Sequence, residues 1–193
     1  FLWAAQLPNV RLALTVSSGA ALTEPSHPYG ALKAAEEEQA LGLASATRAS
    51  VILRAYSVSG PYVRRPEAYA FSDLIRQCAA GRMHVNATRP TFRRYVDVED
   101  ALNVCLALGL SGGAHLVETG GDLIEIGELA DRIRRIVNPA ARLSREPLQS
   151  HKPSTYASDN QSWTAACLAT EVVPRTLDAQ IEWTFTGLPG TGR

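Results

Sequence analysis

Three residues in the first part of the chain combine types and spacing that suit acid–base chemistry. Tyr29 and Lys33 are four positions apart in a stretch of helical character, so their side chains share one face of that helix. An ammonium beside a phenol stabilises the phenolate, which makes Tyr29 a credible general acid and base for a carbinol or carbonyl group. The hydroxyl of Ser18, at the end of the preceding apolar run, could hold the same substrate oxygen.

The rarity of lysine gives this pair its weight. The chain has six tyrosines but only two lysines, Lys33 and Lys152. A Tyr-x3-Lys pair therefore arises by chance in about 6% of such sequences, and its place after a strand ending Ser17-Ser18 lowers that by roughly another order of magnitude. Ser18 taken alone has a plain structural explanation, because serine is common at strand ends and turns. The pair in its context favours a functional role.

The elements that must position these residues form a parallel crossover unit. Residues 10–16 and 50–56 are short apolar runs typical of strands buried on both faces of a parallel sheet. Between them, Ser26-His27-Pro28 predicts the start of a helix that reaches about Gly42. The acidic run 36–38 on this helix is most simply a solvated face. Ser18 then lies at the carboxyl edge of the sheet, where open α/β sheets bind ligands.

After Pro61 the predicted helices and strands become shorter and alternate along the chain. Helices are predicted over 67–80 and over 126–137. Three more are predicted to begin at caps: one at Asp97, with Val98 as its first residue, and the last two at Asp159 and Thr176. Short strands are predicted at 83–85, 94–96 and 114–118. Residues 1–5 have the character of the middle of a helix, and 189–193 that of a frayed tail.

Composition restricts the classes of partner. Nineteen basic residues balance nineteen acidic ones, which excludes the charge bias of a nucleic-acid or membrane-surface protein. No stretch reaches transmembrane length. Three widely spaced cysteines without a CxxC favour buried free thiols in a reducing compartment such as the cytoplasm. The scattered histidines and cysteines predict no metal site.

Two motifs give the chain a resemblance to a known family. Ser17-Ser18-Gly19-Ala20 followed by Pro-Tyr-Gly-x-x-Lys-x-x-x-Glu, here 28–37, resembles the active-site signature of the extended short-chain dehydrogenase/reductase superfamily. This branch contains the NAD-dependent sugar-nucleotide epimerases and dehydratases. Residues 93–101 resemble its Arg-Asp-Tyr/Phe-x-His-Val-x-Asp motif, and the likeness covers nearly the whole chain.

The resemblance implies roles for particular residues. Tyr29 would be the acid/base, Lys33 would assist it and hold the nicotinamide ribose, and Ser18 would steady the reacting oxygen. Arg54–Pro61 resembles the strand and loop that line the nicotinamide and the sugar. This assigns Tyr56, Ser57 and Val58 to the cofactor and Ser57 also to the substrate. Arg93 would grip the substrate's diphosphate, a task that suits a guanidinium fork.

Departures from the family pattern keep several functions open. Gly19-Ala20 cannot replace the Asp-Glu pair of the dehydratases, so epimerisation or simple oxidation/reduction is favoured over dehydration. Ser57 stands where the family has a sugar-facing Asn, and Arg94 where it has Asp, which favours a reductase of a non-sugar carbonyl as an alternative. The strand–GxxGxxG–helix that receives a dinucleotide pyrophosphate is not found, so a non-catalytic binding or assembly relative is a further alternative.

These observations together predict an α/β chain that holds part of a Rossmann-like, doubly wound parallel sheet and a small α/β substrate-binding lobe. Residues 1–61 would be the later part of the cofactor domain. Residues 62–193 would be mainly the lobe, with 93–118 returning to the sheet. The expected cofactor is NAD or NADP, and the expected substrate is a nucleotide-sugar or another small molecule. A homodimer is expected by analogy with the superfamily, and the chain is expected to be an incomplete enzyme that is inactive alone.

Overall fold

The computed structural model describes residue 7 and residues 9–188, which divide into two compact units. Unit 1 comprises 1–56, 99–120 and 157–174, and unit 2 comprises 57–98, 121–156 and 175–193. The helix expected at 1–5 and the tail expected at 189–193 lie outside the described residues. Each unit is an α/β structure, as predicted from the sequence.

The sheet of unit 1 has three parallel strands in the order β1-β2-β7, namely β1 (Leu12–Ser18), β2 (Ala49–Ala55) and β7 (Ala114–Glu118). The central strand is the most apolar, and its Val51 and Ile52 are fully buried. Because β1 and β2 are parallel, the predicted crossover through an intervening helix is confirmed.

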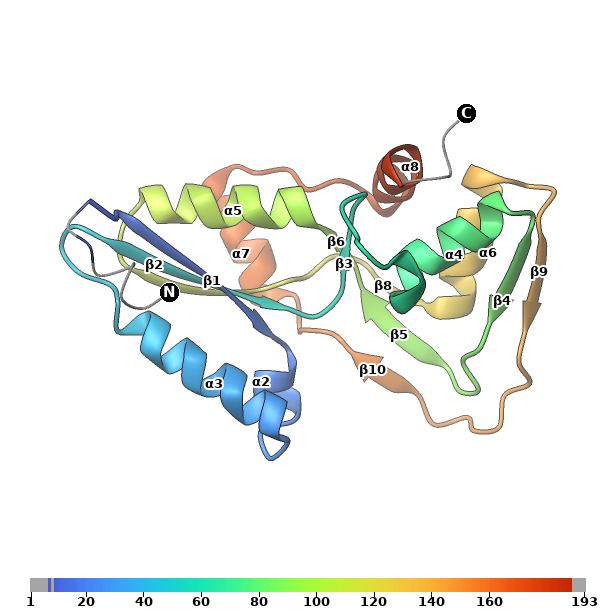
Figure 1. The fold of residues 1–193 in the computed structure, drawn as a ribbon, viewed down its shortest axis with the longest axis horizontal. Helices are drawn as coiled ribbons and strands as arrows, with labels where there is room; N and C mark the ends of the chain where they lie inside the picture. Colours follow the sequence, from blue (N-terminus) through green and yellow to red (C-terminus); the bar gives the residue numbers. More distant parts are fainter. Residues whose placement is uncertain (1–6, 8, 189–193) are drawn as a thin grey trace. The chain divides into compact units, whose positions relative to one another are not determined.

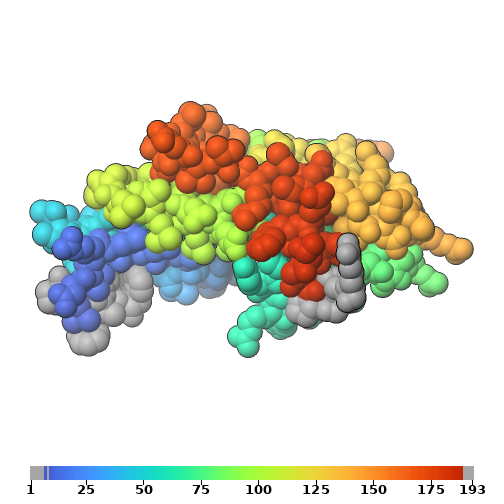
Figure 2. Space-filling view, turned by 90° about the horizontal axis from the view of Figure 1, so that it is seen from above, coloured from blue at the N-terminus to red at the C-terminus, as the bar shows by residue number. Residues whose placement is uncertain are grey.

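Helices cover both faces of this sheet (Figure 1). On one face lies α3 (Pro28–Leu41), where the Ser50 hydroxyl donates a hydrogen bond of 2.6 Å to the carbonyl of Ala40. On the other lies α5 (Val98–Leu110), whose Gly109 leaves room for the side chain of Leu12. Atoms of α5 are visible at the surface in Figure 2. Leu110, the last residue of this helix, is 90% exposed.

A third segment, 157–174, also belongs to unit 1, whereas 62–193 were predicted from the sequence to lie mainly in the lobe. Its helix α7 (Gln161–Thr170) packs against β7, where the Ser162 hydroxyl accepts a hydrogen bond of 3.1 Å from the Glu118 amide. A Cβ added at Gly120 would lie 2.6 Å from the Cβ of Trp163, so only glycine allows this approach. The return segment is likewise shorter than predicted, because 93–98 belong to unit 2 and so do 57–61.

Unit 2 is built on short strands. The strand β5 (Thr91–Arg94) lies between β10 (Ser154–Tyr156), which is parallel to it, and β8 (Leu123–Glu125), which is antiparallel. Two further parallel pairs join β4 (Arg82–Val85) to β9 (Arg142–Arg145), and β3 (Val58–Ser59) to β6 (Val96–Asp97).

Helices enclose the apolar core of unit 2. They are the 3₁₀ turn η1 (Pro66–Ala68), α4 (Ala70–Ala79), α6 (Ile126–Val137) and α8 (Leu177–Gly187). Ile75, Leu129, Ile133 and Ile181 meet in this core with no exposed surface. Burial of such side chains contributes on the order of 2 kcal/mol each. The free thiol of Cys78 is buried in the same core, as predicted.

The observed elements differ from the predicted ones mainly where they are short. The helix predicted over 67–80 is interrupted at Tyr69, whose extended backbone separates η1 from α4. Thr176 caps α8 as predicted, by accepting a hydrogen bond from the Ala179 amide. The strands β3, β8, β9 and β10 and the short helix α2 (Ala20–Thr23) were not predicted. In the part of the chain that the structure describes, no helix is both long and apolar enough to cross a bilayer.

Candidate active site

The carboxyl edge of the unit 1 sheet brings the ends of three strands together. Ser18 pairs in register with Ala55, and the Gly19 amide extends this pairing by donating a 2.8 Å hydrogen bond to the Ala55 carbonyl. The Ser18 hydroxyl oxygen accepts a hydrogen bond of 3.2 Å from the Ala20 amide, which begins α2 directly after the strand. Ser18 is therefore held in a turn at the edge of the sheet.

Tyr29 lies in the first turn of α3, close to this edge. The helix begins with Pro28, and the His27 ring caps it by accepting a hydrogen bond from the Tyr29 amide. The next residue, Gly30, fits tightly against α2: an added Cβ would overlap the Glu24 carbonyl oxygen and lie 2.6 Å from that of Ala20. The start of α3 is thereby fixed against the residues that follow Ser18, and the Tyr29 side chain is half exposed.

Lys33 reaches the outer edge of β1. Its Nζ donates a 3.4 Å hydrogen bond to the Val16 carbonyl and forms a 2.8 Å ion pair with Glu36. The structure thus brings the elements that carry Ser18, Tyr29 and Lys33 to one end of the sheet. Their catalytic roles stay predictions.

Tyr56 closes the same edge from β2. A Cβ added at Gly19 would lie 2.5 Å from Cδ1 of the Tyr56 ring, so the ring covers the turn next to Ser18. The Tyr56 hydroxyl donates a 3.0 Å hydrogen bond to Glu118, and its amide donates to the Thr119 hydroxyl. Hydrogen bonds therefore hold both the hydroxyl and the backbone of Tyr56.

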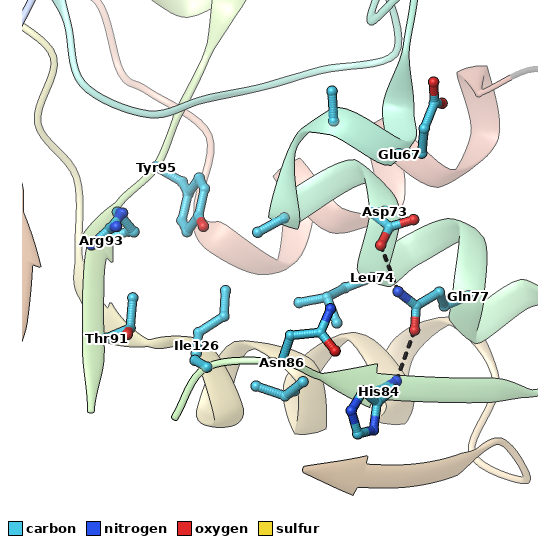
Figure 3. A pocket seen from close by; sticks show the side chains of 14 residues that line it. Glu67, Asp73, Leu74, Gln77, His84, Asn86, Thr91, Arg93, Tyr95 and Ile126 are labelled. Atoms are coloured by element: carbon cyan, nitrogen blue, oxygen red, sulfur yellow. Dashed lines mark hydrogen bonds between the residues drawn. The ribbon is translucent and has the colours of Figure 1, made fainter. Parts of the chain in front are cut away.

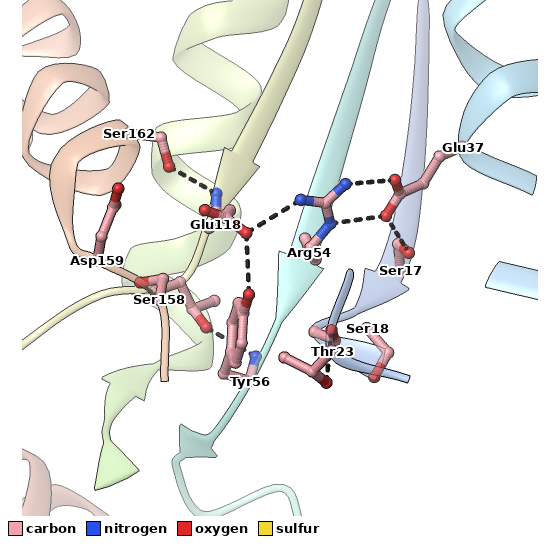
Figure 4. Close-up of polar contacts among 12 residues, drawn as sticks. Ser17, Ser18, Thr23, Glu37, Arg54, Tyr56, Glu118, Ser158, Asp159 and Ser162 are labelled. Atoms are coloured by element: carbon pink, nitrogen blue, oxygen red, sulfur yellow. Dashed lines mark hydrogen bonds and ion pairs between the residues drawn. The ribbon is translucent and has the colours of Figure 1, made fainter. Parts of the chain in front are cut away.

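A chain of charged groups lies beneath this edge (Figure 4). The guanidinium of Arg54 donates to both oxygens of Glu37, at 2.9 and 2.6 Å, and to Glu118 at 3.0 Å. The Ser17 hydroxyl donates to Glu37 at 2.6 Å. Burial by itself raises the pKa of the Glu37 carboxyl, but the hydrogen bonds from Arg54 and Ser17 outweigh burial and leave the pKa below its ordinary value.

This network corrects the prediction that the acidic run 36–38 is a solvated face, because Glu37 is only 6% exposed. Its signal in the sequence is a spacing: Tyr29, Lys33 and Glu37 follow one another at intervals of four, on one face of the helix. A charged Arg54 within the apolar run of β2 is a second signal, since a buried arginine needs a partner.

Arg93 belongs to unit 2, where it lines a cavity of about 290 Å³ (Figure 3). Its guanidinium lies 5.7 Å from the centre of the Tyr156 ring and donates to the carbonyl of Phe92. The neighbouring Arg94 does not line this cavity and donates a 2.6 Å hydrogen bond to the Gly121 carbonyl. The side chains of Arg93 and Arg94 therefore leave opposite sides of β5.

The cavity at Arg93 combines an apolar floor with polar walls. Leu74 and Ile126 contribute apolar surface, whereas Asp73, Gln77, His84 and Asn86 contribute polar atoms around it (Figure 3). The Gln77 side chain is fixed because its oxygen accepts a 2.7 Å hydrogen bond from the His84 amide. The wall carries Arg93 beside two carboxylates, Glu67 and Asp73, and such a mixed wall suits a polar small molecule.

Ser57 and Val58 also lie in unit 2, directly after the boundary that follows Tyr56. The Ser57 carbonyl accepts a hydrogen bond from the Val96 amide, which begins the pairing of β3 with β6. Val58 lines an open hollow of about 760 Å³ together with Arg64 and Arg65. No group of three or more potential metal ligands occurs among the described residues.

Sequence comparison gives one family match. A model of the NAD dependent epimerase/dehydratase family matches residues 14–117. No curated protein sequence matches the chain.

Solved structures share the fold. MoeE5 in complex with UDP-glucose and NAD is 22% identical, with a TM-score of 0.70 over 95% of this chain and 68% of that protein. UDP-glucose 4-epimerase from Brucella ovis in complex with NAD is 20% identical, with a TM-score of 0.71 over 94% of this chain and 66% of the epimerase. RMD from Pseudomonas aeruginosa, complexed with NADPH, is 19% identical, with a TM-score of 0.69 over 91% of this chain and 66% of RMD. The chain spans about two thirds of the length of these proteins, and at such identities the likeness establishes the fold.

Proposed function

The chain belongs to the NAD dependent epimerase/dehydratase family, and from this we propose that it takes part in NAD(P)-dependent oxidation and reduction at a carbon of a nucleotide-linked sugar. Epimerisation or reduction is the proposed reaction. The observation that carries the proposal is the placement of Tyr29, Lys33 and Ser18 on adjoining elements at the carboxyl edge of the sheet.

Tyr29 is the proposed acid and base. Its half-exposed phenol, in the first turn of α3, is accessible to a substrate hydroxyl, from which the phenolate takes the proton. Lys33 stabilises the phenolate by its positive charge, and Ser18 holds the substrate oxygen. In the reverse direction Tyr29 returns the proton.

The residues present fit one end of the cofactor. The phenol of Tyr29 and the ammonium of Lys33 can donate hydrogen bonds to a nicotinamide ribose, and both lie at the carboxyl edge where α/β sheets bind such groups. Bound NAD or NADP supplies a hydride acceptor and donor. Tyr56, Ser57 and Val58 are the further proposed contacts, and Tyr56 contributes a ring whose position is fixed by Gly19 and Glu118.

Arg93 is the proposed ligand for the substrate's diphosphate, and Ser57 a contact to its sugar. Support for the first comes from the cavity of unit 2, which Arg93 lines together with polar side chains; among the described residues its guanidinium forms no ion pair with a carboxylate. Arg94, which departs from the family pattern, donates its hydrogen bond to the backbone carbonyl of Gly121. The homodimer and the cytoplasmic location stay predictions.

Replacement of Tyr29 by Phe tests the proposal. The replacement is made in a full-length enzyme, which is assayed with UDP-glucose and related nucleotide-sugars, with NAD or NADPH, by following cofactor absorbance and the sugar products. We expect Tyr29→Phe to lower turnover by a factor of about 10² or more with cofactor binding largely retained, since only the proton-transferring hydroxyl is removed. Unchanged turnover would exclude Tyr29 as the acid/base, and activity confined to non-sugar carbonyls would move the proposal to that substrate class.

A further inference from the structure

We propose that Arg54 is a positioning residue that fixes the rotation of α3 on the sheet and, with it, the placement of Tyr29 and Lys33 relative to Ser18. The proposal rests on the proposed function, because it concerns how that acid–base group is held. All of the residues involved lie in unit 1.

The first observation is a stripe on α3. Tyr29, Lys33 and Glu37 are spaced by four, so they share one face of the helix. Glu37 is the buried end of this stripe and forms two hydrogen bonds with Arg54 through both of its oxygens. A rotation of the helix by one residue is about 100° and would break this bidentate pair while it turned Tyr29 away.

The second observation is that Arg54 is itself held from the opposite side. Ser17, Arg54 and Glu118 are register partners on β1, β2 and β7, so their side chains leave the same face of the sheet, and Glu118 accepts the third guanidinium hydrogen bond. With a carboxylate on each side, the guanidinium cannot follow a shift of α3. Lysine would keep the charge but not this planar fork.

The third observation joins the network to the turn at Ser18. The Glu118 oxygen that accepts from Arg54 also accepts from the hydroxyl of Tyr56, whose ring covers Gly19. One carboxylate therefore aligns both parts of the acid–base group: α3 through Arg54, and the Ser18 turn through Tyr56 (Figure 4).

Stability alone explains the network poorly. Two carboxylates surround one guanidinium, with side chains only 8–14% exposed, so the cluster carries one excess negative charge. Apolar side chains of similar volume are often as stabilising as a buried ion pair or more so. What the charges add is a fixed geometry, and a misplacement of about 1 Å at a reacting group can lower a rate about 10²-fold.

The test uses Arg54→Lys and Glu37→Gln, with Glu38→Gln as a matched control. Glu38 is the next residue on α3, its side chain is exposed, and no side-chain contact joins it to the described residues of the sheet. Turnover is measured at a temperature at which circular dichroism shows each variant folded, and hydrogen exchange is followed by mass spectrometry. We expect kcat to fall about 10- to 100-fold in both test variants, with KM changed less than about threefold. In both test variants, hydrogen exchange should be faster than in the wild type in peptides covering 29–37 and unchanged in α6. In Glu38→Gln, exchange should match the wild type in all peptides.

Each outcome decides the proposal. Faster exchange in α3 with unchanged kcat would make Arg54 merely structural and overturn it, as would unchanged exchange in both variants. Should Arg54→Lys fail to fold, Glu37→Gln keeps the side-chain volume and answers the same question. A full-length wild-type enzyme that is inactive toward every nucleotide-sugar would contradict the proposed function, and the exchange of 29–37 would then decide by itself whether Arg54 holds the helix.

Discussion

The Nζ of Lys33 lies 3.4 Å from the carbonyl oxygen of Val16, at the outer edge of β1. Arg11 and Gly19 bond to β2 through their peptide groups, so the alternation along the strand directs the Val16 carbonyl away from β2. The ammonium therefore donates to a carbonyl that faces away from β2, while it stays on the face of α3 that carries Tyr29.

Replacing Lys33 by Met should remove the charge that assists Tyr29 and keep most of the side-chain volume. We expect kcat/KM to fall by at least about tenfold, because the reacting phenol loses the positive charge that assists its proton transfer. Lys152→Met is the matched control, because Lys152 is the other lysine of the chain and is exposed in unit 2. Equal values of kcat/KM for the two variants would exclude this role for Lys33.

Arg93→Ala should mainly weaken substrate binding. A charge-assisted contact at a site distant from the reacting carbon contributes about 1.5–3 kcal/mol, so KM for a nucleotide-sugar should rise about 10- to 150-fold with kcat nearly constant. Arg94→Ala serves as the comparison, because its guanidinium bonds to the Gly121 carbonyl and should affect stability instead. A KM that rises only in Arg94→Ala would place the substrate arginine one residue later.

Gly30→Ala should displace the start of α3. The added methyl would overlap the Glu24 carbonyl and crowd that of Ala20, and backbone atoms cannot rotate away. We expect a loss of about 2 kcal/mol or more in the free energy of unfolding and a loss of turnover. Gly42→Ala, at the other end of the same helix, meets its nearest atom at an ordinary 3.4 Å and should be neutral or slightly stabilising. Urea unfolding of both variants provides the measurement.

The network at Arg54 should make stability depend on pH in acid. The Glu37 carboxyl has a lowered pKa in the folded protein, against an ordinary value of 4.5. A carboxyl of this kind stabilises the fold fully above its unfolded pKa, and that stability is lost as the pH falls through the lower folded pKa. The free energy of unfolding of the wild type should exceed that of Glu37→Gln by about 1–3 kcal/mol at pH 7. The difference should shrink below about pH 4.5; a difference that grows in acid would contradict the assignment.

Sequence patterns predicted the longer elements well, because they depend on periodicity within a segment. The strand Ala114–Glu118 and the helix Ile126–Val137 were predicted with the bounds observed. The strand at Ser154–Tyr156 was not, since three residues carry no period and its pairing with β5 involves residues some sixty positions earlier.

The candidate site could be predicted where it follows a local motif, as for Tyr29, Lys33 and Ser18. Arg54 and Glu118 could not be paired in advance, because their contact depends on the register between β2 and β7, which one sequence does not reveal. The burial of Glu37 was missed for a related reason: three consecutive glutamates indicate a solvated face unless the partner of the middle one is known.

The division of the chain into two interleaved units has a consequence for how the protein can be cut and assembled. The polypeptide passes from one unit to the other after Tyr56, Val98, Gly120, Tyr156 and Pro174, so each unit is assembled from three separate stretches. Neither unit can be expressed as one continuous segment. Cleavage by a protease after Val98, Gly120 or Tyr156 would produce two fragments, each holding strands or helices of both units, and those fragments should stay associated until denaturant is added. Because β7 can complete its sheet only after 57–98 have passed through the other unit, most contacts join distant residues, and folding should be slow for a chain of this size.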